Sequence, residues 1–215
     1  EGWFKEKFTI KRYVYNYYRP PQHLQTEWAF PVKYKKYSFS RAPKHTLTLK
    51  KIIDEIRPRI NYPLHNAGFG GAFFLLSKPI PKKAYNEIIS LCKKLSIPLD
   101  MGKPPVAPFM KEFKRPIWRV PFFKEFYDFL EKKGLKPEKN TQGGQASIDY
   151  VRKINPSSLG IVKEIPYITD KKINNNSITK YIKRDILKKS YLKDLEILDF
   201  IINKLKTNGL NRRSD

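Results

Sequence analysis

The chain has 215 residues, of which 40% are hydrophobic, and its 44 Lys and Arg against 20 Asp and Glu give a formal net charge of +24. This hydrophobic content suffices for a folded core and excludes disorder of the whole chain. The large positive charge indicates an anionic partner, which is a nucleic acid or, less often, an anionic membrane surface.

Residues 1–45 are dense in rings and cations. They hold twelve aromatic residues and ten Lys or Arg against three acidic residues. Four prolines interrupt the segment, and it has no apolar stripe of helical period, so only a short strand at "YVYNY" is expected. We predict an extended basic and aromatic arm over 1–45. For four of its rings, packing on the protein's own core is as good an interpretation as RNA contact: Trp3, Phe4, Trp28 and Phe30.

Two stretches of this arm, "KRYVYNYYRPPQH" and "KYKKYSFSRAPKH", interleave rings with cations. Unpaired ammonium groups are costly to bury, whereas RNA offers phosphates to the cations and base faces to the rings. The alternatives are a solvated charge run for the cations and core packing for the rings. The residues predicted to contact RNA phosphates are Lys11, Arg12, Arg19, Lys33, Lys35, Lys36, Arg41 and Lys44. Those predicted to stack on bases or fill gaps in the RNA surface are Tyr17, Tyr18, Tyr34 and Tyr37.

Residues 46–169 show the changing periodicity of a small α+β core. Apolar residues at helical spacing predict a helix that starts near Thr46 or Thr48 and stops before Pro58. The run "GGAFFLLS" at 70–77 predicts a strand buried on both faces. A second helix is expected over 82–96, with Ala84, Ile88, Leu91, Cys92 and Leu95 on its buried stripe.

In the second half of this core, prolines and glycines mark the ends of the predicted elements. Five prolines make 97–120 a predicted long connection with a brief strand at "IWRV". The segment "PFFKEFYDFLEKKG" predicts a helix that begins near Pro121 and ends at Gly134. Residues 136–147 are expected to form a loop, and 160–169 are expected to return as a strand.

Residues 170–215 form a predicted basic tail. Two helices are expected, around 177–190 and 192–207, the second with a stripe of Leu and Ile residues. The predicted domain organisation is therefore an arm at 1–45, an α+β core at 46–169 and a helical tail at 170–215.

Few residues suggest catalytic chemistry. The only cysteine, Cys92, rules out an internal disulfide, and the three histidines lack the spacing of a zinc site, so no metal or cofactor is expected. The glycines of "GFGG" at 68–71 precede a strand and are expected to relieve crowding against backbone. Asp100 and the later "EFK" (Glu112, Lys114) match the acid, acid-x-Lys pattern of Mg²⁺-dependent nucleases, but prolines on both sides argue against the strand that this pattern needs.

In layout, the whole chain resembles the class of mitochondrial ribosomal proteins. The resemblance rests on the two arm stretches quoted above, on the compact α+β centre and on a basic tail ending "NGLNRRSD". It implies a non-enzymatic structural component that binds rRNA and neighbouring ribosomal proteins, takes no small-molecule substrate and resides in the mitochondrial matrix. The alternatives are a Mg²⁺-dependent RNA-processing nuclease and an accessory subunit of a mitochondrial membrane complex.

The ends and the apolar runs of the chain bear on localisation. The longest apolar run, at 67–76, is shorter than the roughly 20 residues that a membrane-spanning helix needs, so no membrane span is expected. The chain begins at Glu1 and not at Met, and we expect that an N-terminal piece was removed or omitted.

Overall fold

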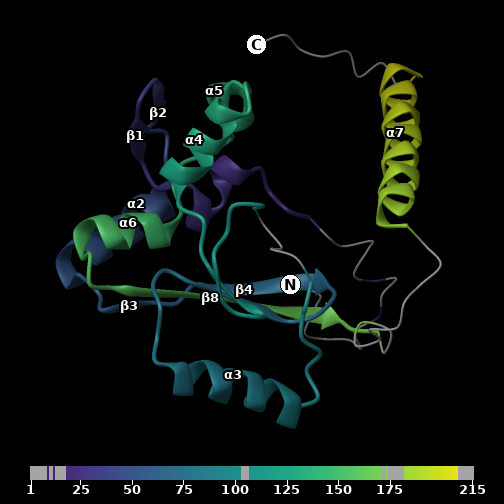
Figure 1. Ribbon diagram of the computed structural model, residues 1–215. Coiled ribbons are helices and arrows are strands. Elements are labelled where there is room, and N and C mark those ends of the chain that lie inside the picture. Colours follow the sequence, from purple (N-terminus) through teal and green to yellow (C-terminus); the bar gives the residue numbers. More distant parts are fainter. Residues whose placement is uncertain are drawn as a thin grey trace. The chain divides into compact units, whose positions relative to one another are not determined.

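The computed structural model describes residues 18–102, 107–170 and 182–207, together with Thr9, Arg12 and Ile173. It divides into two units, Glu1–Asn174 and Asn175–Asp215. The first unit combines helices with a mixed sheet, which confirms the predicted α+β class (Figure 1). Its helices are α2 (Lys44–Ile56), α3 (Lys82–Lys94), α4 (Phe123–Lys132), α5 (Pro137–Asn140) and α6 (Ser147–Ile154), preceded by the 3-10 turns η1 (Gln22–Leu24) and η2 (Thr26–Trp28). Its strands are β1 (Val32–Tyr34), β2 (Tyr37–Phe39), β3 (Ile60–Asn61), β4 (Leu64–Phe69), β5 (Phe73–Leu76), β6 (Glu112–Lys114), β7 (Ile117–Arg119) and β8 (Leu159–Ile168).

The strand β8 organises the six-stranded sheet. On one side it pairs in parallel first with β3 and then with β4, and on the other side it pairs antiparallel with β5. β5 continues the sheet through a parallel pairing with β7, which in turn pairs antiparallel with β6. β8 thus lies between two strands, β4 and β5, that follow each other closely in the sequence.

The alternation of β5 builds the core on both faces of the sheet. Leu75 lies with Trp118, Val162 and the α6 residue Ile148 in one buried cluster. Leu76, the next residue, lies with Ile117 and the α3 residue Tyr85 in another. Figure 1 shows α3 on one face of the sheet and α2 and α6 on the other. The prediction that this strand is apolar on both faces is therefore confirmed.

Just before β5, the chain passes very close to another backbone segment. A Cβ added to Gly71 would lie 2.4 Å from the backbone nitrogen of Asp100, which itself donates to the carbonyl of Ala72. A larger residue would push these segments apart. The expectation that glycines in 68–71 relieve crowding against backbone is confirmed at Gly71.

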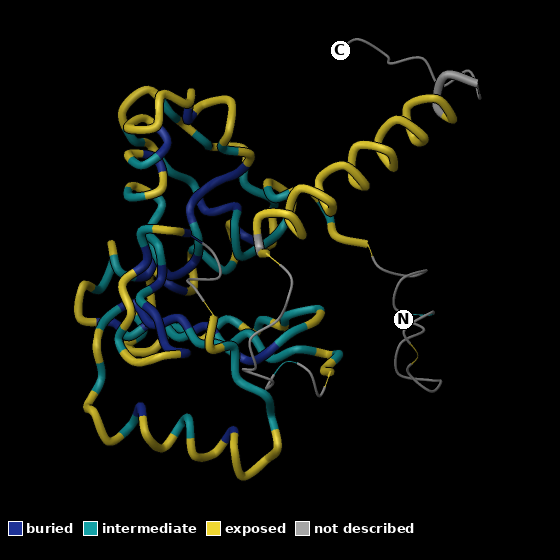
Figure 2. Tube along the Cα trace, turned by 45° about the vertical axis from the view of Figure 1, so that its right-hand side comes forward, coloured by how far each residue is buried: buried dark blue, intermediate teal, exposed yellow. Residues whose placement is uncertain are grey.

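Helix α3 confirms the predicted helix but corrects its buried stripe. Cys92 and Tyr85 are buried, as a small residue and a ring facing the sheet. Leu91 and Leu95, predicted on the same stripe, are 55% and 58% exposed. The exposed face dominates along α3 in Figure 2. The prediction was wrong because the sheet covers a band narrower than the apolar stripe of the sequence.

Substitution by Asp should distinguish the neighbouring residues Leu91 and Cys92 of α3. Leu91→Asp should lower the free energy of unfolding by no more than about 1 kcal/mol, because the side chain already meets water. Cys92→Asp should unfold the first unit, because it places an unpaired charge in the core. Urea denaturation followed by circular dichroism measures the free energy of unfolding of both variants. A Leu91 variant that unfolds as readily as the Cys92 variant would show that Leu91 is buried, as the sequence predicted.

Several elements were not predicted. The proline-spaced stretch 97–120 contains β6 as well as the predicted β7, the expected loop at 136–147 contains α5, and α6 follows it. β3 and β4 lie in a stretch where polar and apolar residues are mixed, so the sequence shows no clear strand alternation there. The expected strand at 13–17 lies outside the described residues.

The second unit consists, in its described residues, of α7 (Lys183–Thr207). It is a continuous helix through residues 190–192, so the prediction of two helices separated at this point was wrong. No Gly or Pro occurs between Lys183 and Thr207, and without a breaker the helix continues. Most of its described side chains are exposed, as Figure 2 shows.

Candidate nucleic-acid interface

The stretch "KYKKYSF" forms a hairpin of β1 and β2, which pair antiparallel with Lys33 opposite Ser38 and Tyr34 opposite Tyr37. Lys35, in the turn, has a left-handed backbone with φ of 49°. Because side chains alternate along a strand, the two pairs face opposite sides. Lys33 and Ser38 are exposed, whereas Tyr34 and Tyr37 are half-buried.

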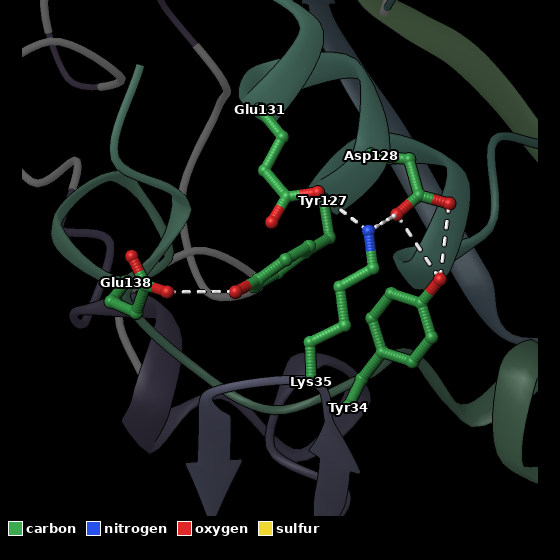
Figure 3. A network of polar contacts seen from close by, with 6 residues as sticks. All are labelled: Tyr34, Lys35, Tyr127, Asp128, Glu131 and Glu138. Carbon is green, nitrogen blue, oxygen red and sulfur yellow. Dashed lines mark hydrogen bonds and ion pairs between the residues drawn. The ribbon is translucent and has the colours of Figure 1, made fainter. Parts of the chain in front are cut away.

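The ring of Tyr34 and the ammonium of Lys35 contact helix α4 (Figure 3). The Tyr34 hydroxyl donates to the carboxylate of Asp128, with 3.1 Å to each oxygen. The Nζ of Lys35 lies 2.6 Å from Asp128 and 2.5 Å from Glu131. The hydrogen bond from Lys35 is the main cause that lowers the pKa of Asp128. The charge of Lys35 is therefore already matched by two carboxylates of its own chain.

Tyr127 connects the hairpin contact to α5. Its ring lies edge-on to Tyr34 at 5.4 Å between centroids, and its hydroxyl donates to Glu138 at 2.7 Å. Burial, followed by this hydrogen bond, raises the pKa of Tyr127 to about 12. The same hydrogen bond lowers the pKa of Glu138. Figure 3 shows how these polar groups surround the turn of the hairpin.

Tyr37 also contacts its own chain. Its hydroxyl donates to the carbonyl of Gly143 at 2.5 Å, and its ring lies 5.6 Å from that of Phe123. The structure thus places Tyr34 and Tyr37 against α4 and the loop that precedes α6. Stacking of these two rings on RNA bases stays a prediction, and it would require both to give up these contacts.

The remaining predicted residues differ in exposure and in contacts. Lys33, Lys36, Arg41 and Lys44 are exposed, and among the described residues none of the four forms an ion pair with Asp or Glu. Tyr18 is 79% exposed, and Arg19 donates from Nε to Gln25 at 3.3 Å. The backbone nitrogen of Arg12 donates to the hydroxyl of Thr9. Lys11 and Tyr17 lie outside the described residues.

Of the four rings with two open interpretations, Phe30 belongs to the core. It is 0% exposed and packs with Ile53, Tyr150 and Val151. Trp28 is half-buried with its ring 5.8 Å from that of His65. Trp3 and Phe4 lie outside the described residues.

Two lysines missed by the sequence reasoning join Lys33 around a hollow of about 370 Å³. Lys124 comes from α4 and Lys153 from the last turn of α6. Each is an ordinary exposed helical lysine in the sequence, more than 80 residues from Lys33. Only the tertiary structure could reveal that the three share one surface.

The three residues of the acid, acid-x-Lys pattern each form a hydrogen bond or an ion pair with another residue of the chain. Glu112 and Lys114 lie on β6, so the expectation that prolines prevent a strand here was wrong. Glu112 pairs with Arg115 at 2.7 Å, Lys114 donates to Asn86, and Asp100 accepts from the backbone nitrogen of Gly102. Among the described residues, no group of three or more His, Cys, Asp or Glu is placed to hold a metal ion.

No helix in the described part combines the length and the apolar character needed to cross a membrane. No family model matches the chain, and no curated protein and no solved structure matches it.

Proposed function

We propose that this chain is a structural, RNA-contacting component of a mitochondrial ribosome, located in the matrix with rRNA and neighbouring ribosomal proteins as partners. The observation that carries the proposal is the set of exposed cations along 33–44, in which Lys33, Lys36, Arg41 and Lys44 form no ion pair with Asp or Glu among the described residues. In a chain of formal net charge +24, such cations are suited to phosphate contacts.

Sedimentation tests the assembly. The tagged chain from mitochondrial lysate should migrate in a sucrose gradient with large ribonucleoprotein particles and move to light fractions after RNase treatment. Migration as a light species before RNase, or recovery with membranes that RNase does not alter, would contradict the proposal and favour a membrane-complex subunit.

Two lysines of the hairpin, one in β1 and one in the turn, test which side of it faces RNA. Lys33→Gln should reduce the slope of log affinity against log salt by about 0.7 to 0.9, the value for one lost phosphate contact. Lys35→Gln should change this slope less, because Asp128 and Glu131 already neutralise the Lys35 ammonium. Binding of single-stranded RNA measured by fluorescence anisotropy at several salt concentrations gives both slopes. An equal reduction of the slope in the two variants would show that Lys35, in the turn, contacts phosphate as well.

A Mg²⁺-dependent RNA-processing nuclease is the second candidate function. It is favoured by the position of Glu112 and Lys114 on β6, because the acid-x-Lys part of the nuclease pattern needs a strand. The purified chain would then cleave RNA only with Mg²⁺, and Glu112→Gln would abolish cleavage. RNA left intact by the wild-type chain with Mg²⁺ would refute this candidate.

A further inference from the structure

The hollow beside the hairpin is bordered by four elements of the first unit. Lys33 and Ser38 come from β1 and β2, Ser40 follows β2, Lys124 comes from α4, and Lys153 from α6. Gln145 closes it between the strands and α6, with its side-chain amide donating to the carbonyl of Pro31 at 2.7 Å. We call this site, defined by Lys33, Lys124 and Lys153, the lysine hollow.

The charges around the lysine hollow are unbalanced. Among the described residues, its lining includes three lysines and no Asp or Glu. Other lysines nearby are neutralised, since Lys35 pairs with two carboxylates and Lys50 lies 2.6 Å from Asp54. The three hollow lysines form no such ion pair among the described residues, although Lys124 and Lys153 contribute, as minor causes, to lowering the pKa of Asp128 and of Asp54. Lys124 also lies 5.3 Å from the centre of the Tyr34 ring. Like charges gathered around one concavity repel one another, and a bound anion would relieve that repulsion.

The polar lining also suits a phosphate. Within the described part of the chain, the hydroxyls of Ser38 and Ser40 have no hydrogen-bond partner, so both can donate to a ligand oxygen. The Gln145 amide is held by Pro31 and shapes the wall. Ammonium groups and hydroxyls are common protein partners of phosphate oxygens. A volume of about 370 Å³ admits a phosphodiester with part of its sugar.

From these contacts we infer that the lysine hollow is a phosphate subsite that holds one backbone phosphate of a bound RNA. The inference rests on the proposed RNA-binding function and adds the place where the backbone is held. Lys33, Lys124 and Lys153 neutralise the phosphate from three elements, and the Ser38 and Ser40 hydroxyls donate to its oxygens. Because these elements belong to one folded unit, the subsite is built before RNA arrives.

Two triple variants with the same change in charge test the subsite. K33Q/K124Q/K153Q removes the hollow lysines, whereas K82Q/K94Q/K139Q removes three exposed lysines of α3 and α5 that do not line it. The first variant should reduce the salt slope for single-stranded RNA by about 2 to 3, and the control by less than about 1. Unchanged thermal melts would show that both variants are folded.

Amide resonances report on the site directly. In ¹⁵N spectra of the wild-type chain, single-stranded RNA and pyrophosphate should each shift the amides of Ser38, Ser40 and Gln145, and the hollow variant should lose these shifts. Equal loss of slope in both triple variants, or RNA binding without shifts at these amides, would overturn the subsite while leaving RNA binding intact. Shifts with phosphatidylserine vesicles and not with RNA would overturn it in favour of a membrane surface.

Failure of the proposed function has a different signature. If the wild-type chain binds no RNA, pyrophosphate alone decides whether the hollow takes phosphate. Shifts in the wild-type chain that the hollow variant lacks would support a site for free phosphate groups, and the absence of shifts would overturn it.

Discussion

Phe30→Ala should lower the free energy of unfolding by about 3 to 5 kcal/mol, the range for truncating a fully buried phenylalanine. Phe30 is 0% exposed, and its ring stacks on Tyr150 at 5.2 Å between centroids. Its backbone nitrogen and oxygen both pair with Gln145, at 3.2 and 3.0 Å. The substitution would therefore leave a cavity between α2 and α6 at the point where the hairpin joins the core. Urea denaturation followed by circular dichroism measures the loss.

An exposed ring of the same type serves as the control. Phe69 is 62% exposed, and Phe69→Ala should change the free energy of unfolding by less than about 0.5 kcal/mol. Phe30→Leu should recover much of the loss, because it restores most of the volume. A Phe30→Ala variant as stable as the Phe69 control would show that the segment before the hairpin is not part of the core.

The stability of the protein relative to its Asp149→Asn variant should fall as pH rises from 4 to 7. Asp149 accepts a hydrogen bond from the backbone nitrogen of Phe123, at the start of α4. Burial raises its pKa to about 7, more than the Phe123 N–H and Arg152 lower it. A carboxyl with a raised pKa in the folded state stabilises the fold at low pH, and this stability is lost as pH rises through the folded pKa. The difference amounts to at most about 4 kcal/mol.

The asparagine variant retains an oxygen acceptor for Phe123 but cannot ionise, so its difference from the wild type isolates this titration. Asp54 provides a control of opposite sign, because its hydrogen bond with Lys50 lowers its pKa. The stability that Asp54 contributes is present above its unfolded pKa and is lost as pH falls. Denaturation series at several pH values should show opposite trends for Asp149→Asn and Asp54→Asn, and a constant Asp149 difference would mean that this carboxyl is solvated.

Elements with strong local signals could be predicted from the sequence, and the others depend on distant partners. Helix α3 and strand β5 combine clear periodicity with bounding Pro or Gly residues. The β1–β2 hairpin turns through Lys35 in a left-handed conformation and lacks the Asn-Gly or Asp-Gly pair that usually marks such a turn. Strand β4 is a strand because it pairs with β8, for example His65 with Glu164. No local window of sequence contains that partner.

The candidate interface shows the same division. The exposure of Lys33 agrees with an interpretation based on charge alone. The inward position of Tyr34 could not be inferred, because its partner Asp128 lies 94 residues further along the chain. Lys124 and Lys153 carry no signal of a shared site, since an exposed helical lysine is the commonest kind of solvated residue.

The position of β8 between β4 and β5 determines when the chain can fold. Phe73 pairs with Glu164 and Leu64 with Lys163, so β4 lacks its partner, and β5 lacks one of its two partners, until most of the first unit has been synthesised. Contacts so distant in sequence form slowly, because the loop between them must close first. During that interval the edge of the apolar strand Phe73–Leu76 that later pairs with β8 is open, and such an edge is prone to aggregation. The nascent chain should therefore depend on a chaperone until β8 emerges.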